Sequence, residues 1–169
     1  DGRKGEVVTE PLLDIVIPVK ERADWLELCL TSVRSFTPSA HPYHLYIVDN
    51  LCREPASLSL FDRARDGEFG PCTILPGQNK SFSNSINMGV AAGNAKNIVI
   101  LNSDAIVTEG WSSHFLSDLA NKKVGITGAR SNAAAGLQSD SSGLSGVMDP
   151  PFLVFVCVAM RREVFEQIG

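Results

Sequence analysis

The sequence predicts an α/β domain whose mainly parallel sheet is covered by helices on both faces. Short apolar runs typical of buried strands alternate along the chain with longer segments of helical periodicity. Several of these runs end in polar residues, as where 98–101 is followed by Asn102-Ser103-Asp104. Strands that alternate with helices pair in parallel through right-handed crossovers, so their carboxyl ends meet at one edge of the sheet.

The first half of the chain predicts a β-α-β-α-β order. The apolar run 13–17, interrupted by Asp14, predicts the first strand, and apolar positions at helical spacing over 25–36 predict the first helix. Asp24 near the start and Pro38 beyond the end are typical helix boundaries. The following predicted elements are a strand over about 43–49, a helix over 55–65 and a short strand over 72–75.

The second half continues the alternation and then changes character. We predict a helix over 81–92, a strand over 97–101, a helix over 110–121, a strand over 123–128 and a helix starting at 161. Residues 129–148 are rich in Ser, Ala and Gly and have no apolar period, which predicts a mobile loop. The apolar run 152–160 is long for a strand and short for a membrane span.

Composition favours a single soluble domain over residues 1–169. The chain is 44% hydrophobic, which is enough for one core at this length, and its formal net charge of −4 argues against a nucleic-acid partner. No apolar segment reaches the roughly 18 residues of a transmembrane helix, and no signal sequence is recognisable. We therefore expect a cytoplasmic location, whether alone or within a larger or membrane-associated protein.

Several common site motifs are missing. Cys29, Cys52, Cys72 and Cys157 form no C-x-x-C pair, which favours reduced core cysteines over a zinc site. Neither glycine-rich phosphate loop of dinucleotide or P-loop enzymes occurs. A phosphate ligand would then need another counter-charge, and a divalent cation on a strand-end carboxylate is the alternative.

Polar residues at three strand ends are the candidates for a site. They are Asp104, the pair Asp49-Asn50 and the turn 18–21. Ligands of open α/β sheets bind beyond the carboxyl ends of the strands, which favours a functional role. Asp and Asn are also preferred as helix caps and in turns, so a purely structural role remains the alternative for each one.

The order and spacing of several pieces resemble family 2 glycosyltransferases, which have the Rossmann-like GT-A fold. The matching pieces are Asp14–Val19, Ile47–Asn50, Asn79–Gly89, Leu101–Asp104 with Gly110-Trp111, and Cys157–Phe165. The resemblance spans almost the whole chain. It implies metal-assisted transfer, with inversion, of a sugar from a UDP- or TDP-type donor to the hydroxyl of a carbohydrate or other acceptor.

The resemblance also implies roles for particular residues. Asn102-Ser103-Asp104 stands where the family has its D-x-D motif, with Asp104 as the metal ligand, and Asp49 would accept a hydrogen bond from the base. Further donor-binding residues implied in this way are Pro18, Val19, Glu21, Asn79, Lys80, Ser81, Arg130, Ser131 and Asn132. The loop from Gln138 onward would close over the donor as a lid.

Asn102 departs from the D-x-D pattern because it is neutral. With one negative charge fewer, we expect weak binding of Mn²⁺ or Mg²⁺ unless a diphosphate supplies the other ligands. The family's general base comes from a segment after the later strands, which places it beyond Gly169. We therefore expect a GT-A domain that is incomplete on its acceptor side and a catalytic base outside these residues. The acids Asp140 and Asp149 are better interpreted as solvated loop residues.

Two alternatives remain open at this stage. Asn102 and the missing base favour a non-catalytic domain that binds a sugar nucleotide or carbohydrate, or serves as a scaffold in a larger protein. A nucleotidyltransferase is disfavoured because the first turn lacks a glycine-rich loop. Self-association is expected if a hydrophobic face of the sheet is left uncovered.

Overall fold

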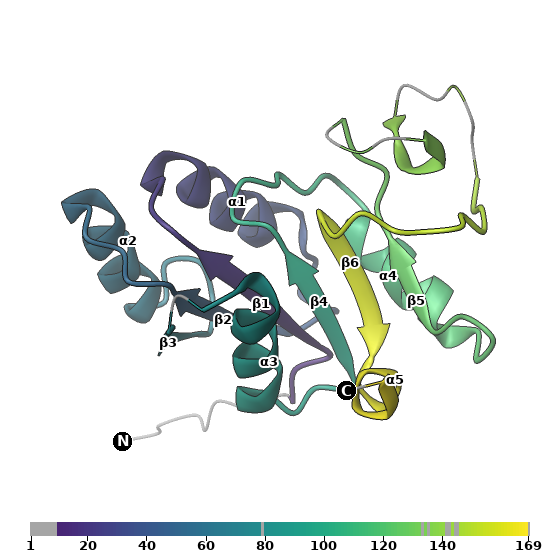
Figure 1. Cartoon of the computed structure of the whole chain (residues 1–169), viewed down its shortest axis with the longest axis horizontal. Coiled ribbons are helices and arrows are strands. Elements are labelled where there is room, and N and C mark those ends of the chain that lie inside the picture. The colour runs from purple at the N-terminus through teal and green to yellow at the C-terminus, as the bar shows by residue number, and fades with distance from the viewer. Residues whose placement is uncertain are drawn as a thin grey trace, which may run out of the picture.

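A computed structural model describes residues 10–78, 80–132, 134, 136–140, 143 and 146–168, in which six strands form one sheet (Figure 1). The strand order is β3-β2-β1-β4-β6-β5. Strands β1 to β4 pair in parallel with their neighbours, whereas β6 is antiparallel to both β4 and β5. The predicted α/β fold with a mainly parallel sheet is confirmed.

The elements lie close to their predicted positions. In chain order they are β1 (Leu13–Val19), α1 (Ala23–Phe36), β2 (Tyr43–Asp49), α2 (Pro55–Arg65), β3 (Cys72–Pro76), α3 (Phe82–Ala92), β4 (Asn97–Leu101), α4 (Trp111–Ala120), β5 (Ile126–Gly128), the short 3₁₀ helix η1 (Gly136–Gln138), β6 (Cys157–Arg161) and α5 (Arg162–Ile168).

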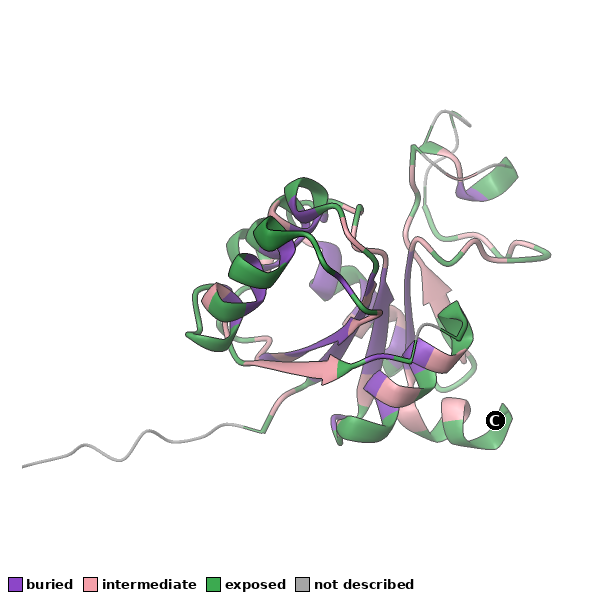
Figure 2. Cartoon of the chain, turned by 60° about the vertical axis from the view of Figure 1, so that its left-hand side comes forward, coloured by how far each residue is buried: buried purple, intermediate pink, exposed green. Residues whose placement is uncertain are grey.

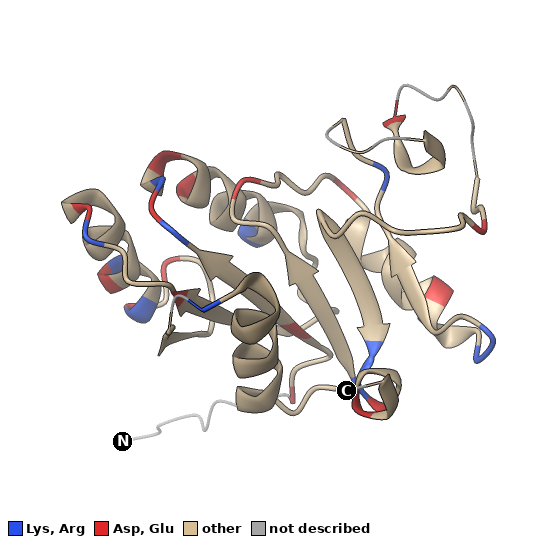
Figure 3. Cartoon of the chain, viewed as in Figure 1, with Lys and Arg blue, Asp and Glu red and all other residues tan. Residues whose placement is uncertain are grey.

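Alternation of side chains along the strands divides the core into two layers. Leu13, Ile15 and Ile17 of β1 pack with the buried faces of α1, α2 and α4 on one side of the sheet. Val16 packs with Ile86 and other apolar residues of α3 on the opposite side. Figure 2 shows the buried strands between helices whose outer surfaces are exposed, and Figure 3 shows charged residues mostly on helices and loops. Helices therefore cover both faces, as predicted.

One predicted strand, 123–128, and one apolar run, 152–160, form strands over only part of their length. The run 152–160 becomes a strand only over Cys157–Arg161, because β4 offers five partners and its last pair is Leu101 with Cys157. Residues before Cys157 have no strand beside them and form a loop. The segment 123–125 precedes β5 as a turn, in which the Val124 amide donates to the Asn121 carbonyl at 2.9 Å.

The excursion between β5 and β6 is held at its base by one buried side chain. Gln138 is 5% exposed, and its Nε2 donates to the carbonyl oxygens of Ala129 and Val154, each at 2.9 Å. Its Oε1 accepts from the Val154 amide at 2.6 Å. Both arms of the excursion are thus attached to the same amide group.

A buried ion pair lies at the amino end of β1, where the sequence shows an acid within an apolar run. Asp14 is fully buried, and its Oδ2 accepts from the Ala95 amide at 2.7 Å and from Arg162 Nη2 at 2.6 Å. Arg162 also donates to the carbonyls of Ala95 and Val90 at 2.8 and 2.9 Å. A Cβ on Gly93 would collide with this carboxylate, which explains the glycine there. The pair joins β1, α3 and α5.

Within the described residues, no helix combines sufficient length with sufficient apolar character to cross a bilayer.

Candidate functional site

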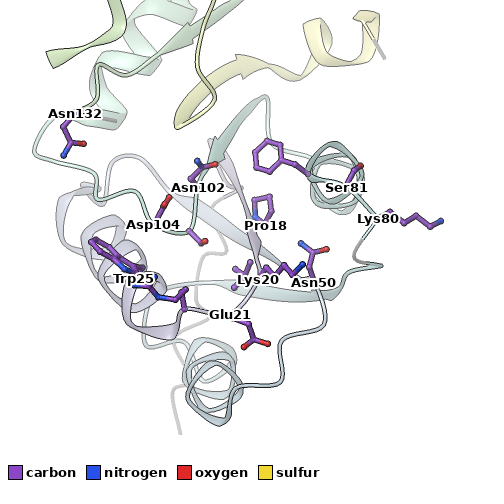
Figure 4. A pocket seen from close by; sticks show the side chains of 14 residues that line it. Pro18, Lys20, Glu21, Trp25, Asn50, Lys80, Ser81, Asn102, Asp104 and Asn132 are labelled. Atoms are coloured by element: carbon purple, nitrogen blue, oxygen red, sulfur yellow. The ribbon is translucent and has the colours of Figure 1, made fainter. Parts of the chain in front are cut away.

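A cavity of about 830 Å³ lies beyond the carboxyl ends of β1 and β4. These two strands are parallel neighbours at the centre of the sheet, so the loops that follow them leave at the same edge. Figure 4 shows side chains from these loops and from α1 and α3 around the opening. The lining residues are Pro18, Val19, Lys20, Glu21, Arg22, Trp25, Asn50, Lys80, Ser81, Phe82, Asn102, Ser103, Asp104 and Asn132.

The turn after β1 forms one wall of the cavity. Its residues Glu21 and Arg22 have positive φ angles of 59° and 65°, which lie in the left-handed region that non-glycine residues rarely adopt. The Glu21 carboxylate accepts backbone hydrogen bonds from the amides of Arg53 and Glu54 at 2.8 and 3.1 Å. Glu21 therefore lines the cavity, but its carboxylate is already bonded to the neighbouring loop.

The end of β2 contributes Asn50 rather than Asp49. The Asp49 Oδ1 accepts from the Cys52 amide at 2.8 Å, and Asp49 is not among the residues that line the cavity. Asn50 does line it, and its Oδ1 lies 2.9 Å from Ser85 Oγ on α3. A Cβ on Gly77 would lie 2.6 Å from both Asn50 Oδ1 and the Asp49 carbonyl oxygen. Only glycine lets the loop after β3 approach β2 this closely.

The start of α3 closes the side of the cavity near β2. Ser81 is the N-cap of this helix, and its hydroxyl accepts from the Asn84 amide at 3.1 Å. Lys80 and Ser81 line the cavity, and Figure 4 shows the Lys80 side chain directed outward. Asn79, the third residue expected here, lies outside the described residues.

The residues after β4 are held by backbone contacts. The Asn102 amide donates to the Val156 carbonyl at 3.0 Å, and the Asn102 carbonyl accepts from the Ala105 amide at 3.1 Å and from the Cys29 thiol at 3.6 Å. Burial raises the pKa of the Cys29 thiol, so it stays protonated and can donate. Asn102, Ser103 and Asp104 all line the cavity, and Asp104 is exposed.

The charges at the opening are of both signs. Arg22 forms an ion pair with Asp24 at 3.0 Å, and this pair holds the pKa of Arg22 above its ordinary value, with a smaller contribution from Asp104. The Arg22 guanidinium also lies 5.8 Å from the centre of the Trp25 ring. No hydrogen bond or salt bridge to the Asp104 carboxylate, or to the Lys20 ammonium, occurs among the described residues, so both charges are available to a ligand.

The loop after β5 brings only one of its three predicted residues to the cavity. Asn132 lines it, whereas Arg130 and Ser131 do not. Arg130 Nη2 donates to the carbonyls of Ser139 and Asp140 at 3.2 and 3.3 Å, within its own loop. Arg130 therefore stabilises its own loop and does not line the cavity.

Three lining residues were not predicted, namely Arg22, Trp25 and Phe82. Trp25 and Phe82 lie in segments whose apolar spacing predicts helices, but they are 39% and 46% exposed and border the cavity. Lys20 and Asn50 were among the strand-end candidates, although the family resemblance implied no donor-binding role for them. Periodicity alone does not distinguish an aromatic residue in the core from one at the rim of a site.

A model of glycosyl transferase family 2 matches residues 14–142, which is well over half of the chain. The chain belongs to glycosyl transferase family 2. The matched region contains the ends of β1, β2 and β4 and every residue that lines the cavity.

One curated relative is the O-antigen biosynthesis protein RfbC of Myxococcus xanthus, which is 23% identical over 94% of this chain and 14% of its own length. Among solved structures, a mannosyltransferase of Pyrobaculum calidifontis, PcManGT, in complex with GDP-Man and Mn²⁺, has a TM-score of 0.74 and 15% identity, covering 96% of this chain and 48% of that one. Residues 1–349 of S. aureus TarS in complex with UDP-GlcNAc have a TM-score of 0.69 and 9% identity, and the match covers 92% of this chain and 47% of that one. The fold is of the GT-A type, and the chain spans about half or less of the length of these proteins.

Proposed function

We propose that this chain forms the donor side of a glycosyltransferase and binds a nucleoside diphosphate sugar in the cavity beyond β1 and β4. The donor is expected to be of the UDP or TDP type, and the full protein would transfer its sugar with inversion to the hydroxyl of a carbohydrate or other acceptor. The observation that carries the proposal is the convergence of Asp104, Asn50 and Lys20 on one cavity of about 830 Å³. That volume lies within the range of small-molecule sites.

The residues after β4 suit a divalent cation that is shared with a diphosphate. Asp104 is exposed and carries the carboxylate of this loop, and Asn102 can add an amide oxygen. Among the described residues, no three His, Cys, Asp or Glu side chains are grouped to hold a metal on their own. Mg²⁺ and Mn²⁺ are commonly bound through one or two carboxylates together with substrate phosphates. When bound, the cation would act as a Lewis acid on the leaving diphosphate.

The chain's own residues would then position the donor. Lys20 follows β1 and Asp104 follows the adjacent strand β4, and both line the cavity. The diphosphate, with its cation on Asp104, would therefore lie between these two side chains. Asn50 offers an amide to a base or ribose, and the aromatic rings of Trp25 and Phe82 offer apolar surface at the rim. These contacts give orientation, which is the contribution to catalysis that a binding half can make.

A domain that binds the donor without completing the reaction is a second candidate. The cavity contains two carboxylates, Glu21 and Asp104, among its lining residues, and Glu21 is bonded to backbone amides. If Asp104 holds the cation, no lining residue is left to deprotonate an acceptor. This favours a general base supplied from outside the cavity described here.

Calorimetric titration with UDP, TDP and GDP, each with Mn²⁺ and with a chelator, tests the proposal. We expect saturable binding of one nucleotide that depends on Mn²⁺ and is lost in Asp104→Asn. The matched control is Asp66→Asn, which removes an exposed acid at the end of α2, away from the cavity. Absence of binding by the folded wild type, or equal affinity in Asp104→Asn, would contradict the proposal. Binding without sugar transfer would favour the second candidate.

A further inference from the structure

Two glutamates join the turns after β1 and β2, because each accepts a hydrogen bond from a backbone amide beside the other. Glu21, in the turn that precedes α1, accepts from the amides of Arg53 and Glu54, which directly precede α2. In return, Glu54 Oε2 accepts from the Ala23 amide at the start of α1 at 3.4 Å and from the Ser57 hydroxyl at 3.1 Å. Carboxylates are favoured at helix amino termini because the first amides there have no partner within the helix.

Neither helix has an N-cap side chain of its own that makes this bond. Arg22 precedes α1 and Glu54 precedes α2, and among the described residues neither side chain accepts a hydrogen bond from a backbone amide of the helix that follows it. The exchange of carboxylates therefore supplies an acceptor to the Ala23 amide, which begins α1, and to the Arg53 and Glu54 amides, which precede α2. We call the pair Glu21 and Glu54 the reciprocal clamp.

The clamp coincides with strained backbone. Glu21, Arg22 and Leu51 have φ angles of 59°, 65° and 64°, and all three lie in the two clamped turns. Non-glycine residues remain in this conformation only where the surrounding contacts hold them. Cys52 adds a contact of the same kind, because its Sγ accepts from the Glu21 amide at 3.2 Å.

We propose that the reciprocal clamp sets the shape of the donor cavity in the absence of ligand, with Glu21 as a positioning residue. The inference rests on the proposed function. Lys20 directly precedes Glu21, and Asn50 directly precedes Leu51, so the two turns carry the cavity's polar groups from β1 and β2. Without the clamp, the strained residues relax and Lys20 and Asn50 lose their fixed separation. Only the fraction of molecules that still has the binding geometry then binds nucleotide.

The test compares Glu21→Ala, Glu21→Gln and Glu54→Ala with Glu166→Ala, an exposed acid on α5 at the other end of the molecule. Titration with UDP and Mn²⁺ measures affinity. We expect Glu21→Ala to bind roughly tenfold more weakly, as when about one molecule in ten keeps the binding geometry. Glu21→Gln should recover part of the affinity because its amide oxygen can still accept one backbone hydrogen bond. The variant that carries both Glu21→Ala and Glu54→Ala should bind nucleotide no more weakly than the weaker-binding of the two single variants, since the two residues act as one unit.

Two readouts do not depend on nucleotide. Cys52 is 7% exposed, and loosening of the turns should increase its rate of reaction with iodoacetamide severalfold, located by mass spectrometry. The amides of Arg53 and Glu54 should exchange faster with deuterium in Glu21→Ala and remain slow in Glu166→Ala.

The outcomes separate the two proposals. If the wild type binds no nucleotide, the proposed function fails, and the clamp is judged by Cys52 reactivity and amide exchange alone. If the wild type binds and Glu21→Ala matches it in affinity and in Cys52 reactivity, the clamp is wrong while the proposed function stands. If Glu21→Ala does not fold, Glu21→Gln and Glu54→Ala provide the same comparison, and wild-type behaviour in both overturns the inference.

Discussion

Replacing Arg162 by Met should lower the free energy of unfolding by about 3–5 kcal/mol, because it leaves the Asp14 carboxylate buried without its cation. Asp14 is fully buried, and its Oδ1 has no hydrogen-bond partner in the part of the chain that the structure describes. After the substitution, Oδ2 retains a single bond, from the Ala95 amide at 2.7 Å. The Val90 carbonyl also loses its donor from Arg162, which adds to the loss.

The size of this effect is large relative to a typical domain stability of about 5–15 kcal/mol. The Arg162 side chain is 17% exposed, so some water can reach the vacated position, which places the expected loss toward the lower end of the range. Equilibrium urea unfolding at neutral pH, followed by circular dichroism, measures it. Lys122→Met is the control, because this exposed lysine lies in a turn and its loss should change stability by no more than about 0.5 kcal/mol.

A double variant decides whether the buried charge is the cause. Asp14→Leu combined with Arg162→Met removes both charges and should recover most of the lost stability, since well-packed apolar pairs often replace buried ion pairs without a net penalty. A loss of less than about 1 kcal/mol in Arg162→Met, or a double variant no more stable than the single one, would refute this reasoning.

Two further predictions concern the neighbourhood of the cavity. Gly77→Ala should destabilise the fold by about 1–3 kcal/mol and weaken nucleotide binding, because its Cβ would lie 2.6 Å from the Asp49 carbonyl oxygen, and backbone gives way less easily than a side chain; an unchanged urea midpoint would contradict it. Burial raises the pKa of the Cys52 thiol to about 11 from an ordinary value near 9, so its alkylation rate should still rise with pH above pH 9 and the free energy of unfolding should fall between about pH 9 and 11. A rate that levels off by pH 9 would exclude this raised pKa.

Much of the fold could be predicted because both strand and helix signals are local. The alternation of apolar runs and helical segments located β1 to β4 and their helices to within a few residues. The end of the long apolar run could not be placed in the same way, since strand length at Cys157 depends on how far β4 extends. Strand pairing depends on two segments, so the sequence of one segment alone does not show where its strand ends.

The candidate site could be predicted only in part. Asp104 and Pro18 were named as candidates because strand ends converge in a parallel sheet, whereas Lys80 was named through the family resemblance. The side to which a loop residue turns depends on contacts across the turn. Asp49 is drawn to the Cys52 amide, and Arg130 to the carbonyls of Ser139 and Asp140, and no pattern along the sequence contains either contact. The roles of these residues toward a donor stay predictions.

The hydrogen bonds of Gln138 hold together the two ends of the excursion between β5 and β6. One amide group bonds to Ala129, just after β5, and to Val154, shortly before β6, so the two strands are held next to each other whatever the length of the chain between them. The entropy of closing a loop grows only slowly with its length. Insertions and deletions between the two arms therefore change the surface beside the cavity without shifting β6 against β4, so this segment can diversify while the sheet stays the same.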